Sequence, residues 1–532
     1  MRFAILLPAL AAALAASSPA TSQTVLSNPE ARSSDVSVRI AASLERLTYR
    51  PDLPGVSGTI VLLESEAKLD DAGKTGLAAL KQQVEASYRA GRIGDAQRSA
   101  YQAISLLRSG NWAADAFPSS LTFDLEPVVD PADPFLVRMR GTWAEAAPAG
   151  ATIALRLSTF ADGREVRDLG RHVLSNRDLV ARPERFAVDL AGIAPGAYRL
   201  DGTIEAEGRS IGEIRAPVSL VANLARERAE IETALAGISG HDDAKATIRY
   251  PFSLAQELFA ATREVRSYDF TAGIERSRQL LAELQAGRDP VVRAKGNIRR
   301  AYYMAEAGTI VPFRLYVPKA WDGRAKLPLM VFLHGANLDD DDSMERAGGL
   351  LPRLAEEKGV IVLAPLGYRM NSMYGAPVPG QFVASSSPIA GIDARRAALS
   401  EKDVLNLTDL ISAEYDVDRR RIYLSGNSMG GMGTWHLAQK YPERWAAIAP
   451  AAAGATDPDY DFSRLRGIPI MPVAGEHDFL RPMVEGTVAK ARAAGLKPQY
   501  MMVPGGDHGT GVEIAMPAIM DFFLGARRTA SK

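Results

Sequence analysis

The stretch RRIYLSGNSMGG at residues 420–431 decides the fold of the C-terminal half of this chain. Residues 422–424 form a short β-branched and aromatic run that is typical of a buried strand. The residues that follow fit the pattern G-x-S-x-G, which carries Ser428 on a sharp turn from a strand into a helix. Glycine is needed on both sides of the turn because side chains there would collide. Residues 429–440 lack proline and are expected to form the helix, so Ser428 is a candidate nucleophile.

Length and charge narrow the classes of protein that fit this chain. A chain of 532 residues is too long for one core, so two to four domains are expected. The net charge of −1 and the lack of a long basic run argue against nucleic acid as a partner. Residues 339–342 form an acidic run that we interpret as a solvated loop rather than a calcium site. The absence of cysteine excludes disulfides, lipid attachment through an N-terminal cysteine, thiolate metal sites and cysteine catalysis.

The N-terminus has the pattern of a secretory signal peptide at residues 1–22. Arg2 precedes an apolar run over residues 3–16, and small residues suited to cleavage follow at 17–22. The apolar run is too short to span a membrane, and no later stretch reaches that length. We therefore expect an exported protein, periplasmic or extracellular, without an integral membrane segment after cleavage.

The mature chain begins with a helical segment, which we place at residues 23–115. Leu77, Leu80, Val84 and Tyr88 recur at helical spacing, and a second helical pattern follows a break at Gly91. A helical hairpin is the simplest interpretation. A second helical segment, a linker at residues 223–290, is expected to pack with it into one helical layer.

Between these two segments, at residues 116–222, apolar residues alternate with polar ones at period two. Four runs are typical of strands: 121–125, 135–139, 153–157 and 186–190. A Pro-Gly-x-Tyr turn at residues 195–198 leads into another strand, and Ile204 and Val218 are expected in two more. Short strands with such turns predict a β-sandwich. The Pro-Gly-x-Tyr step resembles that of immunoglobulin-like accessory modules.

Strands and helices alternate in the last part of the chain, residues 291–532. Continuous apolar runs are separated by helix candidates; the runs are 327–333, 360–364, 445–449, 468–474 and 499–503. This pattern predicts a mostly parallel sheet with helices on both faces, so the fold class is α/β. Residues 365–400 show little periodicity and are expected to form a long loop over the carboxyl edge of the sheet, where ligands bind.

A serine nucleophile requires a base to take its proton, and the base requires a third group to orient it. We call the strand-to-helix turn that carries the serine the nucleophile elbow. In folds with this elbow, the base follows the serine and the acid in the sequence. His508 is the candidate base, because it lies in a glycine-flanked loop after the last strand, whereas His477 is interpreted as a surface residue. Asp478, at the end of the preceding strand, is the candidate acid, and its rivals are Glu476, Asp457, Asp459 and Asp507.

Two backbone N–H groups should bind the oxyanion that forms on the attacked carbonyl. Met429 directly follows the nucleophile at a helix N-terminus, and Ala336 lies in the loop after an apolar strand. His334 and His436 are interpreted as structural. No cluster of His, Asp and Glu has the spacing of a metal site, and no cofactor is implied.

These motifs resemble one branch of the α/β-hydrolases. The string DRRRIYLSGNSMGG at 418–431 is similar to the elbow of polyhydroxybutyrate depolymerase-like proteins, feruloyl esterases and related secreted esterases. The LHG and KYPE motifs at 333–335 and 440–443 support the resemblance, as do the loops of the candidate acid and base. The similarity spans about residues 301–524. It implies Ser428, Asp478 and His508 as a catalytic triad, with Ala336 and Met429 as oxyanion donors.

The resulting hypothesis is a secreted serine esterase that forms an acyl-enzyme. Its substrate is expected to be a small-molecule or polymer-borne ester, such as a feruloyl or other acyl ester or a polyester oligomer. One alternative is a prolyl-oligopeptidase-like serine peptidase, although the large propeller of those enzymes has no counterpart in repeat length here. The alternative from another class is a catalytically silent protein that binds a polymer or a partner.

Overall fold

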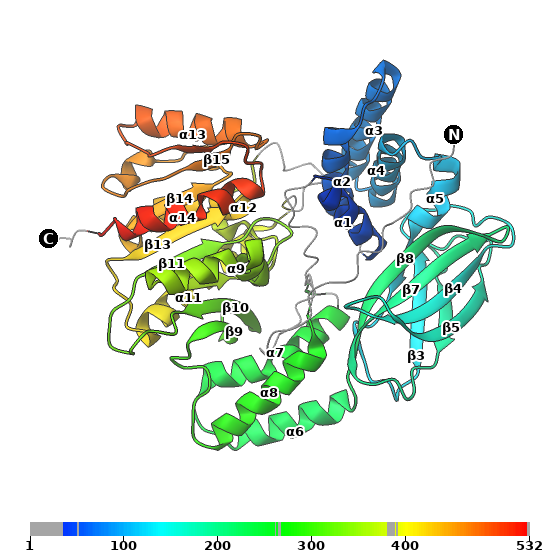
Figure 1. Cartoon of the computed structure of the whole chain (residues 1–532), viewed down its shortest axis with the longest axis horizontal. Coiled ribbons are helices and arrows are strands. Elements are labelled where there is room, and N and C mark those ends of the chain that lie inside the picture. The colour runs from blue at the N-terminus through cyan, green and yellow to red at the C-terminus, as the bar shows by residue number, and fades with distance from the viewer. Residues whose placement is uncertain are drawn as a thin grey trace.

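The computed structural model describes residues 36–49, 53–260, 262–263, 268–379, 389 and 392–528. The signal peptide expected at residues 1–22 lies outside the described residues. Figure 1 shows an α/β domain on one side of the molecule and a region of two β-sheets on the other, with helices between and beside them. Within the described ranges, no helix combines the length and the apolar character needed to cross a bilayer.

Five helices open the described chain. They are α1 (Val36–Tyr49), α2 (Leu53–Glu66), α3 (Asp71–Arg89), α4 (Ile93–Leu107) and α5 (Trp112–Ser120). The sequence predicts a hairpin here, and α3 and α4 form it. Helix α3 begins after Asp70, whose carboxylate accepts the Gly73 N–H. Helices α1 to α4 share a small core that includes Val56, Leu77 and Tyr101.

Two sheets follow and share one apolar core, and we call residues 121–220 the two-sheet region. A three-stranded sheet has the order β1-β3-β6, and a five-stranded sheet has the order β2-β8-β7-β4-β5. The strands are β1 (Leu121–Asp124), β2 (Val128–Val129), β3 (Phe135–Gly141), β4 (Thr152–Thr159), β5 (Glu165–Val173), β6 (Glu184–Val188), β7 (Gly196–Ala206) and β8 (Arg209–Leu220). Val137 from one sheet and Leu155 and Leu200 from the other are fully buried in this core.

One expectation for this region is wrong, and one strand was not expected. Ile204 does not begin a further strand, because β7 continues from the Pro-Gly-x-Tyr turn through Ile204 as one long strand. Strand β5 was not expected from the sequence at all. Its side chains are mostly exposed at the sheet edge, so the apolar alternation that reveals the other strands is missing.

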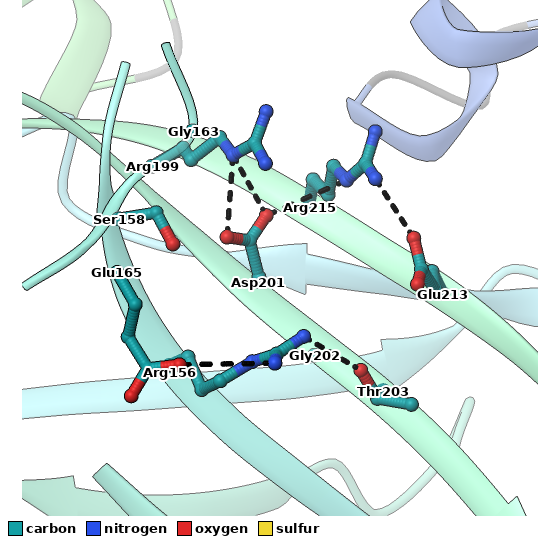
Figure 2. A pocket seen from close by; sticks show the side chains of 10 residues that line it. All are labelled: Arg156, Ser158, Gly163, Glu165, Arg199, Asp201, Gly202, Thr203, Glu213 and Arg215. Atoms are coloured by element: carbon teal, nitrogen blue, oxygen red, sulfur yellow. Dashed lines mark hydrogen bonds and ion pairs between the residues drawn. The ribbon is translucent and has the colours of Figure 1, made fainter. Parts of the chain in front are cut away.

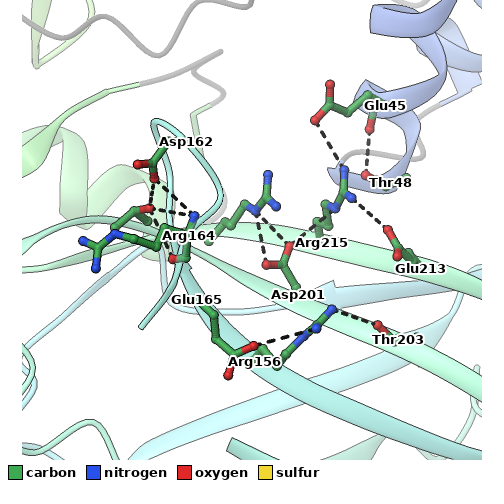
Figure 3. Close-up of polar contacts among 12 residues, drawn as sticks. Glu45, Thr48, Arg156, Asp162, Arg164, Glu165, Asp201, Thr203, Glu213 and Arg215 are labelled. Carbon is green, nitrogen blue, oxygen red and sulfur yellow. Dashed lines mark hydrogen bonds and ion pairs between the residues drawn. The ribbon is translucent and has the colours of Figure 1, made fainter. Parts of the chain in front are cut away.

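Ion pairs cover the outer face of the five-stranded sheet. Arg199 Nε donates to Asp201 at 3.2 Å, and Arg215 Nη2 donates to Glu213 at 2.8 Å. Figure 2 shows these side chains around a shallow hollow. Arg215 Nη1 also reaches Glu45 of α1 at 3.3 Å, as Figure 3 shows, and so ties the first helix to β8. Acidic and basic groups alternate across the hollow, which indicates a structural network.

The second helical segment consists of α6 (Leu224–Ala236), α7 (Asp242–Phe259) and α8 (Phe270–Gln285). The expectation that it packs with the N-terminal helices into one layer is wrong. Ile248 and Leu254 of α7 share a core with Ile274 of α8 and Ala301 of the α/β domain. Helix α7 contacts the edge of the α/β sheet, and α8 contacts β7 and β8 of the two-sheet region. These helices therefore join the two parts.

The α/β domain contains one eight-stranded sheet of order β16-β15-β14-β13-β11-β12-β10-β9. Strands β11 to β16 are parallel, whereas β10 is antiparallel to β12 and to β9. The strands are β9 (Gly296–Met304), β10 (Thr309–Val317), β11 (Leu329–Leu333), β12 (Ile361–Pro365), β13 (Ile422–Asn427), β14 (Ala447–Ala451), β15 (Val473–Gly475) and β16 (Met501–Val503). Successive side chains of β11 point to opposite faces, so Val331 joins one core and Met330 the other.

Helices cover both faces of this sheet (Figure 1). They are α9 (Asp340–Lys358), α11 (Ala394–Glu414), α12 (Met429–Lys440), α13 (Arg481–Ala493) and α14 (Thr510–Leu524), with short 3₁₀ turns η2 (Met373–Gly375), η3 (Pro442–Arg444) and η4 (Phe462–Leu465). Helices α11 and α12 pack on one face and α9 and α14 on the other. The domain is therefore an α/β fold with a mostly parallel sheet. The strand predicted at residues 468–474 is shorter, since only Ile470 forms a bridge before β15 begins.

The acidic run at residues 339–342 is not a solvated loop, so that expectation is wrong. Asp339 caps α9 by accepting the Asp342 N–H at 3.1 Å. Asp341 is buried and pairs with Arg314 of β10 and Arg299 of β9. These arginines come from strands at the far edge of the sheet, and nothing in the acidic run itself reveals them.

Candidate active site

Ser428 lies at the turn between β13 and α12, at the carboxyl edge of the sheet. Its backbone is in a rarely populated conformation, with φ of 57° and ψ of −117°. At two glycines the turn packs closely against neighbouring backbone. A Cβ atom on Gly430 would lie 2.1 Å from the carbonyl oxygen of Leu333, and one on Gly426 would lie 2.5 Å from that of Gly430. Only glycine fits at both positions, and the turn lifts the serine hydroxyl out of the sheet.

The structure brings Ser428, His508 and Asp478 together in one hydrogen-bonded chain. His508 Nε2 lies 2.9 Å from Ser428 Oγ, and His508 Nδ1 lies 2.8 Å from Asp478 Oδ1. The Asp478 side chain is fully buried, and its Oδ1 also accepts the Leu480 N–H at 2.8 Å. This arrangement can take a proton from the serine and hold the resulting imidazolium.

The rival acids have other partners. Glu476 Oε2 accepts the Gly505 N–H at 2.8 Å, and so supports the loop that carries the histidine. Asp507 Oδ1 accepts the N–H groups of Gly509 and Thr510 at 2.9 and 2.8 Å, which holds the turn that leads into α14. Asp457 accepts the Asp459 N–H at 3.0 Å within its own turn.

The two other histidines near the site are held in fixed contacts. His334 is buried, and its ring nitrogens lie 2.9 Å from the Gly335 carbonyl oxygen and 2.8 Å from that of Leu366. His436 Nε2 lies 2.7 Å from Glu401. Neither ring contacts Ser428. Among the residues that the structure describes, no group of three His, Asp or Glu side chains could hold a metal ion.

The expected oxyanion donors lie on either side of the nucleophile. Met429 is the first residue of α12, where the N–H groups have no partner within the helix. The loop with Ala336 runs directly past the serine, since a Cβ atom on Gly335 would lie 3.5 Å from Ser428 Cβ. Asn337 N–H donates to Asn371 Oδ1 at 2.8 Å, which anchors this loop to the segment after β12.

Part of that segment, residues 373–374, is buried behind the site. Tyr368, Met373 and Tyr374 lie in the segment that was expected to form a loop over the sheet edge, and Met373 and Tyr374 are fully buried. Tyr374 Oη donates to the His334 carbonyl at 3.3 Å, and all three residues have positive φ. The expected long loop also ends earlier than residue 400, because α11 begins at Ala394.

Sequence reasoning missed one aromatic residue at the site. Phe479 follows the candidate acid directly, and its ring lies 4.4 Å from the His508 ring between centroids. The side chain is 64% exposed, which is unusual for a residue of this size. The sequence offered one signal for this contact, because an aromatic residue directly follows the candidate acid in a loop after a strand.

The comparisons with known proteins fall on this domain. Residues 305–481 match the family described as putative esterase. The bifunctional acetylxylan esterase/xylanase XynS20E of Neocallimastix patriciarum is 27% identical over 180 residues, which are 33% of this chain and 22% of that protein. The α/β domain is therefore similar in sequence to esterases over residues 305–481.

Two further proteins are similar to part of this chain. The putative esterase NocK of Nocardia uniformis subsp. tsuyamanensis is 28% identical over 199 residues, which are 37% of this chain and 52% of that protein. The solved structure of FphF, a fluorophosphonate-binding serine hydrolase of Staphylococcus aureus, has 17% identity and a TM-score of 0.35, and covers 43% of this chain and 99% of its own. The chain thus spans about half or less of the length of the two curated relatives, with 22% of XynS20E and 52% of NocK covered.

Proposed function

We propose that this protein is a serine carboxylic ester hydrolase with Ser428, His508 and Asp478 as its catalytic triad. The observation that carries the proposal is the unbroken chain of hydrogen bonds from Ser428 Oγ through His508 to the buried Asp478. A serine, an imidazole and a buried carboxylate in this order form the arrangement that activates a hydroxyl for acyl transfer. The esterase family match over residues 305–481 supports an ester as the substrate.

In the first half of the reaction, Ser428 Oγ attacks the ester carbonyl while His508 Nε2 takes its proton. The negative charge on the tetrahedral intermediate is stabilised by the backbone N–H groups of Met429 and Ala336. Asp478 holds the imidazole through Nδ1 and stabilises its charged form. His508 then gives the proton to the leaving alcohol, and the acyl group stays on Ser428.

In the second half, His508 takes a proton from water, which attacks the acyl-enzyme carbonyl. The same two N–H groups stabilise the second oxyanion. When this intermediate collapses, the Ser428–acyl bond breaks, and the proton returns from His508 to Ser428 Oγ. The acid leaves and the free enzyme is restored.

We further propose that the protein is exported and acts on acyl esters of polysaccharides or on polyester oligomers. The signal-peptide pattern at residues 1–22 supports export. The acetylxylan named for one relative supports a polysaccharide-borne ester. The two-sheet region fits an immunoglobulin-like β-sandwich that spaces or shapes the catalytic cleft, because its three- and five-stranded sheets enclose one core.

The test is hydrolysis of a panel of para-nitrophenyl esters and methyl ferulate by the wild type and by Ser428→Ala. We expect the variant to lose about 10⁴-fold or more in kcat. The matched control is Ser425→Ala, three residues earlier on β13, whose hydroxyl donates to the Ala449 carbonyl at 2.7 Å. It should keep its turnover. Equal loss in both variants, or no ester turnover in the wild type, would contradict the proposal, and peptide substrates would then test the peptidase alternative.

A further inference from the structure

Four arginines gather around a second cavity, which is formed by the segment after β12, the start of α11 and residues near the end of α7. The cavity has a volume of about 300 Å³. Its lining includes Arg263, Arg369, Arg395 and Arg396, and Asp393 is the only acidic side chain among the described residues that line it. We call these four side chains the arginine cluster.

The arginine cluster has more positive charge than its acidic partners neutralise. Glu257 bonds to two members, accepting from Arg263 at 2.7 Å and from Arg369 at 3.3 Å. Asp393 caps α11 by accepting the Arg396 backbone N–H at 2.8 Å, so much of its hydrogen-bonding capacity goes to the helix. Among the described residues, the two carboxylates of Glu257 and Asp393 therefore accompany four guanidinium groups. Like charges held this close repel unless an anion lies between them.

Burial makes this repulsion stronger. The Arg263 side chain is 1% exposed, and its Nη2 is a buried donor with no hydrogen-bond partner within the protein. A buried charged donor without a partner is costly. Burial and then the Arg263 charge lower the pKa of Arg369, which is the expected effect of crowded cations.

The cavity lies at the same edge of the sheet as the nucleophile. Ser428 follows β13, and the segment that lines the cavity follows β12; β11 lies between them. Two strand spacings correspond to roughly 10 Å. Hydrogen bonds also connect the two places. Arg396 Nε donates to Ser372 at 3.0 Å, and the neighbouring Asn371 anchors the oxyanion loop through Asn337.

We propose that the arginine cluster is a subsite for a carboxylate carried by the ester substrate. Planar guanidinium groups form paired hydrogen bonds to carboxylates, and several of them around one cavity favour an anion over a neutral group. The two strand spacings between β13 and β12 set roughly 10 Å as the smallest separation between this carboxylate and the scissile carbonyl. This inference rests on the proposed ester hydrolysis and adds the substrate class, an acidic ester.

The test compares two esters that differ only in the terminal group, para-nitrophenyl octanoate and mono-para-nitrophenyl suberate. The variant is Arg395→Glu, since Arg395 is exposed at the rim of the cavity and the change should leave the fold intact. The control is Arg492→Glu, which makes the same charge change at an exposed site on α13. We expect Arg395→Glu to lower the kcat/KM ratio of suberate to octanoate about tenfold or more, mainly through KM. Arg492→Glu should leave the ratio near that of the wild type.

Two outcomes would overturn the subsite. One is a ratio that both variants change equally, which would indicate long-range charge only. The other is inhibition by inorganic phosphate that Arg395→Glu relieves while the ratio stays the same, which would assign the arginine cluster to a free anion. Turnover of para-nitrophenyl octanoate by the wild type tests the proposed ester hydrolysis by itself, because this substrate has no terminal carboxylate. Calorimetric titration of monomethyl suberate into Ser428→Ala, with and without Arg395→Glu, measures the same preference without catalysis.

Discussion

The ring of Phe479 lies against the imidazole of His508, with 4.4 Å between ring centroids, although 64% of Phe479 is exposed. An exposed aromatic side chain in this position shields one face of the base from water. It also offers a flat surface to a substrate bound at Ser428. Both effects would act at the point where the leaving group meets the proton of His508.

Phe479→Ala should therefore weaken catalysis on aromatic esters. We expect kcat/KM for para-nitrophenyl acetate, whose leaving group is aromatic, to fall about three- to tenfold further than kcat/KM for methyl acetate, because an aromatic contact contributes roughly 0.5–1.5 kcal/mol. The control is Tyr303→Ala, which removes a 59% exposed aromatic side chain on β9, far along the sheet. If both variants lose activity alike, or the loss is the same for both esters, Phe479 does not contact the substrate.

The acid of the triad can be identified by two substitutions that change the same kind of group. Asp478→Asn should lower kcat by about 10³- to 10⁴-fold, because an amide can no longer hold the His508 tautomer that accepts the serine proton. Glu476→Gln should keep most of the activity, since Glu476 bonds to the Gly505 N–H and not to the imidazole. Steady-state kinetics on para-nitrophenyl acetate distinguishes them. A reversal of the two effects would make Glu476 the acid.

The tight elbow also predicts opposite effects for two glycine substitutions. Gly430→Ala should destabilise the domain by several kcal/mol or prevent folding, because the new Cβ would lie 2.1 Å from the Leu333 carbonyl oxygen. Gly486→Ala, within α13, meets no atom within 4 Å and should stabilise the helix by about 0.5–1 kcal/mol. Thermal unfolding of both variants measures the difference. A Gly430→Ala protein as stable as the wild type would contradict the close approach of the two segments.

The features that were predictable from the sequence are those that local patterns determine. The nucleophile elbow is recognisable from twelve residues, and continuous apolar runs predict the central strands. Asp478 and His508 could be selected because each follows a strand, and parallel strands bring their carboxyl ends to one edge. Strand β9 was missed because Asn297, Arg299 and Arg300 interrupt its apolar pattern and it lies at the edge of the sheet.

The features that escaped prediction depend on contacts between distant parts of the chain. The burial of Asp341 depends on Arg299 and Arg314, which lie on other elements. The arginine cluster unites Arg263, from near the end of α7, with a segment about a hundred residues later. No periodicity or motif in either segment encodes such a meeting. Charge clusters formed by distant segments therefore have to be found in three dimensions.

Glu401 makes the free energy of unfolding of the α/β domain depend on pH. Burial opposes its ionisation, but hydrogen bonds from His436, Lys440 and Tyr441 outweigh burial and lower the pKa of the Glu401 carboxyl to about 2. A carboxyl with a lowered pKa stabilises the fold above its unfolded pKa, near 4.5, and loses this effect as the pH falls towards 2. At pH 7, Glu401→Gln should lower the free energy of unfolding by about 3 kcal/mol through this linkage, and by about 2 kcal/mol at pH 3.5. Urea denaturation at the two pH values measures the change, with the exposed Glu443→Gln as control, and a difference that does not shrink with acid would show that Glu401 acts through packing alone.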